Sequence, residues 1–306
     1  MGRSPILRRW TRLALLVAVS LTTACAPESA PTTTTTATAT TTTAPSPTTA
    51  PGPDRPVVEV HTEEYLPGLA ATVFSPVPPG AGVLVMVPGG GWQTADPAGF
   101  ADLARYLAET GLVVVTVEVR AAVDDVVYPV PVEDVMCAVG FSAEWAEAQG
   151  QPSGPLVVLG HSTGAHLAAL AALAGPDELP ECSPPALLPD ALVGLAGTYD
   201  VAHLPEVAVS LFGVPPEEDP DLWDRGNPVM RAGARPEVPV LLIHGAEDEL
   251  VPRSFTDEFA SALDSAGHRT TVEIIPAADH HQIYRPESTG SLIGDWAHSL
   301  AGLPSE

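Results

Sequence analysis

The feature that most constrains the fold is an alternation of short, continuously apolar runs with segments of helical periodicity, which begins at Val57. The run 82–87 is apolar after its first Gly and ends in Pro88 and three glycines, as expected for a strand buried on both faces. Helical periodicity follows over 100–109, and a second apolar run occupies 112–119. This order is typical of a βαβ unit, so the sequence predicts a mainly parallel central sheet with helices on both faces.

The alternation continues to the end of the chain. We expect further strands over 156–159, 192–195, 240–243 and 271–275, and further helices over 132–149, 166–174 and 292–300. A chain of 306 residues with 45% hydrophobic content can bury one large core, so we expect a single α/β domain over 57–306. The segment 199–239 is short and rich in Pro and Asp, which predicts a minimal lid.

The first 24 residues have the layout of an export signal. Four arginines precede an apolar run over 13–21, which is too short to cross a bilayer as a helix. The run leads into Leu21-Thr22-Thr23-Ala24-Cys25, which resembles a bacterial lipobox. We therefore expect a lipoprotein signal peptide over 1–24 and lipidation of Cys25, with an ordinary secretory signal as the alternative. The folded domain would then be extracellular and held at the cell membrane by its lipid anchor.

A linker of low complexity follows Cys25. Residues 26–56 are almost entirely Thr, Pro, Ala and Ser, and five consecutive threonines occupy 32–36. Such a segment has too little apolar mass to compensate for the entropy of ordering its backbone. The sequence therefore predicts that 25–56 is a disordered tether that carries the lipid at its first residue.

Charge and ligand spacing exclude several functions. The chain carries 38 Asp and Glu against 13 Lys and Arg, a formal net charge of −25. A surface of this charge repels phosphate backbones, so we expect no nucleic-acid partner. No spacing of His or Cys resembles a set of metal ligands, and we expect neither a metal nor another cofactor.

The candidate nucleophile is Ser162. The predicted strand 156–159 runs into Gly160-His161-Ser162-Thr163-Gly164, a GxSxG sequence placed between a strand and a helix. Small flanking residues are needed there because the turn holds the serine in a strained backbone conformation. The alternative is a glycine-rich turn with an inert serine.

A serine hydroxyl needs a general base, and the base needs an orienting carboxylate. The loop after the strand 240–243 contains Asp248, which we expect to be the acid, with Glu247 as its main rival. The loop after the last predicted strand contains two adjacent histidines, His280 and His281, of which one is expected to face the serine. The remaining histidines of these motifs, His161, His166 and His244, are expected to be structural.

The glycine loop at 89–91 supplies candidate donors for an oxyanion. Acyl transfer requires backbone amides that stabilise negative charge on the carbonyl oxygen, and glycines allow the substrate to approach those amides closely. We expect the amides of Gly90, Gly91 and Thr163 to fill this role. Packing or turn requirements are the alternative explanation for the glycines.

Together these motifs resemble the α/β-hydrolase carboxylesterases of the hormone-sensitive-lipase, feruloyl-esterase-like and kynurenine-formamidase-like branch, over nearly all of 57–303. The resemblance implies the α/β-hydrolase fold and a serine hydrolase that cleaves small carboxylic esters through an acyl-enzyme. It also implies that His280, the residue after Asp279, is the base. The chain departs from the family at Pro88, where a His that helps to shape the oxyanion loop is usual.

Two other functions stay open. The same three residues serve amidases, formamidases and peptidases, although the sequence shows no propeller or peptide-gripping domain. A non-catalytic binding protein with this fold is the other alternative, against which the complete set of three residues in the expected order argues.

Two cysteines remain once Cys25 is assigned to the lipid. Cys137 and Cys182 form an even pair in an exported domain, for which a disulfide is the usual outcome. We expect a structural disulfide between them, with two buried free thiols as the alternative.

Overall fold

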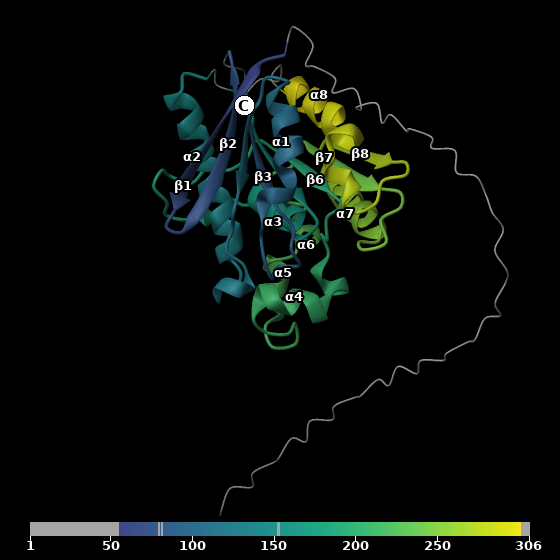
Figure 1. Ribbon diagram of the computed structural model, residues 1–306. Coiled ribbons are helices and arrows are strands. Elements are labelled where there is room, and N and C mark those ends of the chain that lie inside the picture. Colours follow the sequence, from purple (N-terminus) through teal and green to yellow (C-terminus); the bar gives the residue numbers. More distant parts are fainter. Residues whose placement is uncertain (1–54, 79, 81, 152–153, 301–306) are drawn as a thin grey trace, which may run out of the picture. The chain divides into compact units, whose positions relative to one another are not determined.

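An eight-stranded sheet forms the centre of the computed structural model, which describes residues 55–78, 80, 82–151 and 154–300 (Figure 1). The strand order is β1-β2-β4-β3-β5-β6-β7-β8. The strands are β1 (Val57–Leu66), β2 (Leu69–Val77), β3 (Val83–Val87), β4 (Val113–Val117), β5 (Leu156–His161), β6 (Ala191–Leu195), β7 (Val240–Gly245) and β8 (Thr270–Ile275). All pairs among β3 to β8 are parallel, which confirms the predicted mainly parallel sheet.

The first two strands form a hairpin that the sequence pattern did not separate. β1 pairs only with β2, and β2 joins the edge of the sheet through an antiparallel pairing with β4. Within β1, Tyr65 is the only buried residue, and most of the other positions are exposed. An edge strand of this kind has no continuous apolar run, which is the signal that identifies the buried strands.

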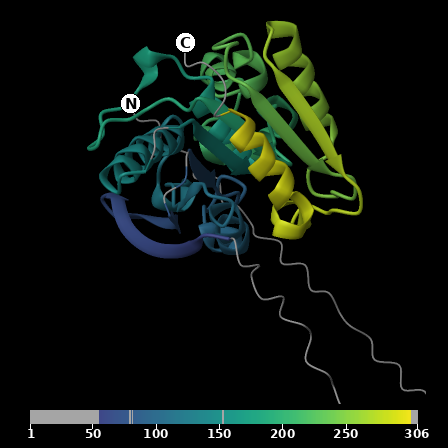
Figure 2. The same cartoon turned by 90° about the horizontal axis from the view of Figure 1, so that it is seen from above.

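Helices cover both faces of the sheet, and Figure 2 shows them on either side of it. The α-helices are α1 (Ala101–Ala108), α2 (Val130–Ala148), α3 (Thr163–Ala172), α4 (Pro205–Phe212), α5 (Pro220–Arg225), α6 (Pro228–Arg231), α7 (Ser254–Ala266) and α8 (Ser291–Leu300). The shorter turns are the 3-10 helices η1 (Pro97–Phe100), η2 (Ala122–Asp124), η3 (Pro176–Glu178), η4 (Val201–His203) and η5 (Gln282–Tyr284), and the π-helical turn η6 (Pro286–Gly290). Among the described residues, no helix has the length and hydropathy that a membrane crossing requires.

The core has two layers because successive side chains of a strand point to opposite faces. In β5, Val158 packs in one layer with Phe259 of α7 and with residues of α2 and α3. Its neighbour Leu159 packs in the other layer, with Leu107 of α1 and Ile293 of α8. The alternation fixes the strand register. Because β3, β5, β6, β7 and β8 run parallel, the loops after β3, β5, β7 and β8 lie at one edge of the sheet.

Several helices differ from the sequence prediction. The segment 199–239 contains three short helices, α4 to α6, none longer than eight residues. The prediction omitted α7 entirely, and it began the helix after the nucleophile at 166, whereas α3 begins at Thr163. The predicted signal peptide over 1–24, the lipidated Cys25 and the linker up to residue 54 lie outside the described residues.

A disulfide joins Cys137 and Cys182, as the sequence predicted, with a Cα–Cα distance of 5.8 Å. Cys137 lies on α2, which packs against the sheet, and Cys182 lies in the loop that leads to β6. The bridge therefore ties the loop between η3 and β6 to a helix that packs against the sheet.

Candidate active site

The backbone of Ser162 is held in an uncommon conformation at the turn between β5 and α3. Its φ is 55° and its ψ is −125°, a region that costs a residue with a side chain about 1–3 kcal/mol. The neighbouring strand supports the turn, because the N–H of Ser162 donates to the carbonyl oxygen of Leu195 at 2.9 Å. The expected strained turn after a buried strand is therefore present at this serine.

Steric crowding explains why the two positions that flank the turn, 160 and 164, are glycine. A Cβ atom at Gly160 would collide with the backbone of Gly164 and Ala165. A Cβ atom at Gly164 would collide with the carbonyl oxygens at the end of β3, those of Val87 and Pro88. Only glycine lets α3 begin this close to the ends of β3 and β5.

The structure brings Asp248 and His280 together from the loops after β7 and β8. Oδ2 of Asp248 lies 2.7 Å from Nδ1 of His280, and the two side chains are 0% and 7% exposed. Oδ1 of Asp248 accepts hydrogen bonds from the N–H groups of Leu250 and Val251, each at 2.9 Å. Because a carboxylate only accepts, the His280 proton lies on Nδ1, which leaves Nε2 as a proton acceptor.

The surroundings of Asp248 keep it ionised. Burial by itself opposes the charged form, but hydrogen bonds from the Val251 N–H, from His280 and from the Leu250 N–H outweigh that effect and lower the pKa of Asp248 below its usual value. The carboxylate is therefore charged at neutral pH, at the position where it faces the imidazole.

Ser162 and His280 line one cavity of about 300 Å³, together with the glycine loop at 89–91. Of the two rivals that the sequence left open, His281 reaches the rim of this cavity, where its Nδ1 lies 3.4 Å from the hydroxyl of Tyr284. Glu247 is exposed and is not among the lining residues. A larger cavity of about 380 Å³, between α2, α3 and α5, has neither Ser nor His among its lining residues.

His161, expected to be structural, contacts His280 directly. Its Nε2–H donates to the backbone carbonyl oxygen of His280 at 2.8 Å, and the two ring centroids are 4.5 Å apart. Burial, reinforced by the nearby His280, lowers the pKa of His161 to about 3. A neutral ring therefore packs against the candidate base and fixes its main chain. No sequence pattern indicates this contact, because it joins a side chain and a backbone carbonyl 119 positions apart.

His166 and His244, which were also expected to be structural, are buried and make structural contacts. His166 accepts a hydrogen bond from Trp92 Nε1 at 3.3 Å and donates to the carbonyl oxygen of Gly226 at 2.8 Å, and burial lowers its pKa to about 4. His244 bonds to Thr256 at 2.8 Å and to the carbonyl oxygen of Val251 at 3.0 Å, and burial lowers its pKa as well.

The glycine loop is bound to the first residue of α3. The N–H groups of Gly90 and Gly91 both donate to Oγ1 of Thr163, each at 3.1 Å. The Thr163 side chain is buried, and Thr163 is absent from the residues that line the cavity. The three residues predicted as oxyanion donors are thus adjacent, and a side chain of one holds the amides of the other two.

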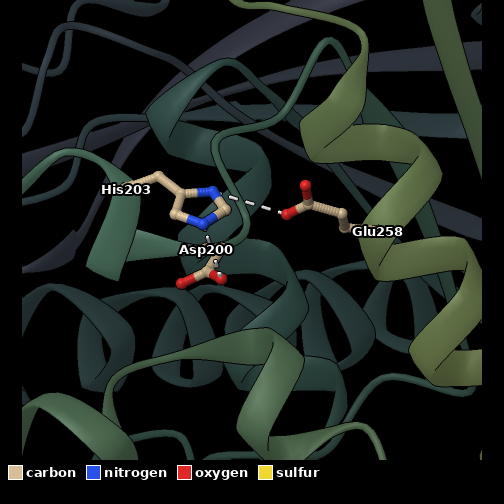
Figure 3. Close-up of side chains that lie close together, drawn as sticks. All are labelled: Asp200, His203 and Glu258. Carbon is tan, nitrogen blue, oxygen red and sulfur yellow. Dashed lines mark ion pairs between the residues drawn. The ribbon is translucent and has the colours of Figure 1, made fainter.

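Within the described part of the chain, one group of potential metal ligands comes together: Asp200, His203 and Glu258 (Figure 3). Nδ1 of His203 lies 3.4 Å from Glu258, and Nε2 lies 3.9 Å from Asp200. The two ring nitrogens face different carboxylates, whereas a metal is bound by one nitrogen and needs the oxygens on that same side. The arrangement is that of an exposed ion-pair cluster, which sequence spacing missed because Glu258 comes from α7.

Comparison with known proteins places this chain in a family. Esterase LipC of Mycobacterium tuberculosis (strain ATCC 25618 / H37Rv) is 31% identical over 241 residues, which are 72% of this chain and 57% of LipC. Esterase LipQ of the same organism is 27% identical over 215 residues, 65% of this chain and 50% of LipQ. This chain therefore spans about half the length of these curated relatives.

Solved structures show the same fold at low sequence identity. A truncated form of a carbohydrate esterase from gut microbiota has a TM-score of 0.70 and 19% identity, and the match covers 83% of this chain and 99% of that one. The propionate-bound esterase Est2 of Thermogutta terrifontis has a TM-score of 0.64 and 21% identity over 83% and 98% of the two chains. These likenesses confirm the predicted α/β-hydrolase fold. The family model described as BD-FAE matches residues 77–263, more than half of the 306 residues, and the protein is therefore a member of the BD-FAE family.

Proposed function

We propose that the protein hydrolyses carboxylic esters with Ser162 as nucleophile, His280 as general base and Asp248 as the orienting acid. The observation that carries the proposal is the buried 2.7 Å contact between Asp248 and His280, at a cavity that Ser162 lines from a strained turn. The curated relatives described as esterases support the same chemistry.

In the proposed reaction, Nε2 of His280 takes the proton of the Ser162 hydroxyl as Oγ attacks the ester carbonyl carbon. Asp248 keeps the other ring proton on Nδ1 and stabilises the imidazolium that forms. The amides of Gly90, Gly91 and Thr163 stabilise the oxyanion of the tetrahedral intermediate. His280 then gives its proton to the leaving alcohol. Water next attacks the acyl carbon as His280 takes its proton, and His280 returns that proton to Ser162 Oγ as the carboxylic acid leaves.

The cavity points to small, uncharged esters. Its volume of about 300 Å³ is at the lower end of the range for small-molecule sites. Phe100, Leu250 and Tyr284 supply apolar surface, no Lys or Arg lines the cavity, and Asp96 adds a carboxylate at its edge. A substrate with a negative charge near the scissile bond would meet no compensating cation there.

The first test compares wild type with Ser162→Ala on p-nitrophenyl esters of increasing acyl length. We expect wild type to prefer short acyl chains and the variant to lose about 10⁵-fold or more in kcat, because removing a serine nucleophile leaves only binding and oxyanion stabilisation. Circular dichroism and thermal unfolding establish that both proteins are folded. Matching p-nitroanilides measure amide cleavage, and wild type that cleaves these faster than the esters would make the protein an amidase.

An inactive but folded wild type, or a Ser162→Ala variant with full activity, would contradict the proposal. The first result would favour a binding protein with this fold, and the second would place the reaction at another residue.

We also propose that the protein is exported and anchored to the membrane by a lipid on Cys25. The disulfide between Cys137 and Cys182 supports export, because such bonds persist in oxidising compartments. Detergent phase separation of the full chain tests the anchor: wild type should enter the detergent phase and Cys25→Ser the aqueous phase. Equal partition of the two would contradict lipidation at this cysteine.

A further inference from the structure

The loop that carries two of the proposed oxyanion donors has no side chain of its own with which to hold them. Pro88 lacks an N–H group, and Gly89 is wedged so closely that a Cβ atom there would lie 2.8 Å from Cβ of Ser162. Gly90 and Gly91 follow with φ values of 154° and 66°, which only glycine adopts without strain. A glycine segment of this kind can turn its amides in several directions unless something fixes them.

Backbone N–H groups of Gln93 and Thr94 hold the Gly90 carbonyl oxygen at 3.1 and 3.3 Å, and the hydroxyl of Thr163 holds the N–H groups of Gly90 and Gly91. Oγ1 accepts hydrogen bonds from Gly90 N and Gly91 N at 3.1 Å each, and a hydroxyl oxygen has two lone pairs, so both are used. Thr163 is the first residue of α3 and is only 6% exposed, so its position is set by the helix and by the turn at Ser162. The contact therefore relates the glycine loop to the nucleophile through one rigid residue.

Two N–H groups that converge on one oxygen are held as a pair, as two donors to one oxyanion must be. Thr163 does not line the cavity, so the pair must turn from Oγ1 towards the cavity when an oxyanion forms there. The neutral hydroxyl of Thr163 accepts more weakly than an oxyanion does, because hydrogen bonds to a charged oxygen are roughly twice as strong. In the free enzyme, the hydroxyl therefore accepts the hydrogen bonds of both amides. It competes with the neutral carbonyl oxygen of the bound substrate for these amides. When that oxygen becomes negatively charged in the tetrahedral intermediate, it is the stronger acceptor and takes the two hydrogen bonds. Interactions that strengthen only at the transition state increase kcat.

We propose that Thr163 is a positioning residue whose hydroxyl holds the Gly90 and Gly91 amides converged until the oxyanion takes them over. This inference rests on the proposed ester hydrolysis at Ser162. It assigns to the side chain of Thr163 a role separate from that of its backbone amide.

The test uses Thr163→Val, which keeps the shape of the side chain and removes its acceptor, and Thr163→Ser, which keeps the hydroxyl. We expect Thr163→Val to lose about 10- to 100-fold in kcat with KM within about threefold of wild type, since misaligned donors weaken transition-state binding. Thr163→Ser should keep at least about half of the wild-type kcat. Inhibition by a trifluoromethyl ketone, whose adduct with serine carries an oxyanion, should weaken in parallel with kcat in the valine variant.

Two further measurements separate positioning from a general loss of structure. The midpoint of the pH–rate profile should be the same in wild type and Thr163→Val, because the Asp248–His280 contact is untouched. Hydrogen exchange of the Gly90 and Gly91 amides, followed by NMR without substrate, should accelerate at least about tenfold in Thr163→Val and stay slow in Thr163→Ser.

The outcomes distinguish this inference from the proposed function. A valine variant as active as wild type or more active, beside an inactive Ser162→Ala, would overturn the role of Thr163 and leave the esterase intact. Wild type without activity on any ester would overturn the proposed function and, with it, the catalytic role of the hydroxyl. Unchanged amide exchange in Thr163→Val would overturn the positioning role whatever the activity.

Discussion

Two groupings of a histidine with carboxylates lie in the segments that follow β6, β7 and β8, and they differ in distance and in burial. Asp248 and His280 are 2.7 Å apart, and their side chains are 0% and 7% exposed. His203 lies 3.9 Å from Asp200 and 3.4 Å from Glu258, and its side chain is 53% exposed. The two groupings have the same residue types, so composition alone does not tell them apart.

The two groupings can be compared in how each carboxylate is held. Backbone N–H groups fix one oxygen of Asp248 and leave the other for His280, whose main chain is held in turn by His161. In the second grouping, Oδ1 of Asp200 is also fixed, by the Ala202 N–H and by Asn227, but its Oδ2 stays 3.9 Å from His203. Glu258 projects from α7 with its side chain 43% exposed, where water competes for the charge. A fixed carboxylate is therefore not enough: the buried His280 lies within hydrogen-bond distance of Asp248, whereas the exposed His203 does not reach Asp200.

The largest expected effect comes from breaking the buried grouping with Asp248→Asn. An amide can donate to Nδ1 and so favours the wrong tautomer of His280, in which Nε2 carries the proton and cannot accept one from serine. We expect kcat for ester hydrolysis to fall about 10⁴-fold at neutral pH, by analogy with the known substitution of this kind in a serine protease. Steady-state kinetics on p-nitrophenyl acetate measures the loss.

Glu247→Gln is the matched control, because it changes the neighbouring, exposed carboxylate in the same way. It should leave kcat within about twofold of wild type, as most exposed substitutions away from a site do. If Glu247→Gln rather than Asp248→Asn abolished activity, the assignment of the acid would move to Glu247.

An effect of intermediate size concerns His161, the neutral ring behind His280. Its pKa is lowered to about 3 in the folded protein, against 6.5 for an exposed histidine. Between these values the unfolded chain binds a proton that the folded protein does not, so His161 makes the protein less stable as pH falls below 6.5. In His161→Gln, the drop in unfolding free energy from pH 7.5 to pH 5 should be about 2 kcal/mol smaller than in wild type.

Urea unfolding at the two pH values measures this difference. The comparison uses the change with pH in each protein, so a general destabilisation by the substitution cancels. Equal pH dependence in wild type and His161→Gln would mean that the pKa of His161 is the same in the folded and the unfolded protein and would contradict the lowered value.

The fold was predictable wherever a strand is buried on both faces. Runs such as 82–87 and 240–243 are continuously apolar because helices cover both sides, and the structure has β3 and β7 at these positions. The hairpin of β1 and β2 escaped prediction because β1 is an exposed edge strand. α7 escaped although Phe255, Phe259 and Leu263 recur at intervals of four residues, a helical spacing that predicts a buried stripe.

The candidate site was predictable where a local motif places its residues. The turn at Ser162 and the loops that contain Asp248 and His280 follow strands, and parallel strands end at one edge of the sheet. The contacts of Thr163 with Gly90 and Gly91, and of His161 with the His280 carbonyl, join segments 72 to 119 positions apart. Spacing within one motif cannot indicate which backbone amide a hydroxyl will meet, so these contacts required the structure.

The smallest effect is expected from His203→Gln in the exposed grouping. Exposed ion pairs contribute at most about 1 kcal/mol, because water screens the charges and the side chains lose entropy when they pair. The variant should therefore differ from wild type by less than about 0.5 kcal/mol in unfolding free energy at neutral pH and should keep full esterase activity.

Wild type should also unfold at the same temperature with added Ca²⁺ or Zn²⁺ as with a chelator, because the two ring nitrogens of His203 face opposite carboxylates. A rise in unfolding temperature with one of these ions, lost in His203→Gln, would mean that the ring turns so that one nitrogen and both carboxylates bind a metal. The two groupings would then differ because one binds a metal ion, and not because one is buried and the other exposed.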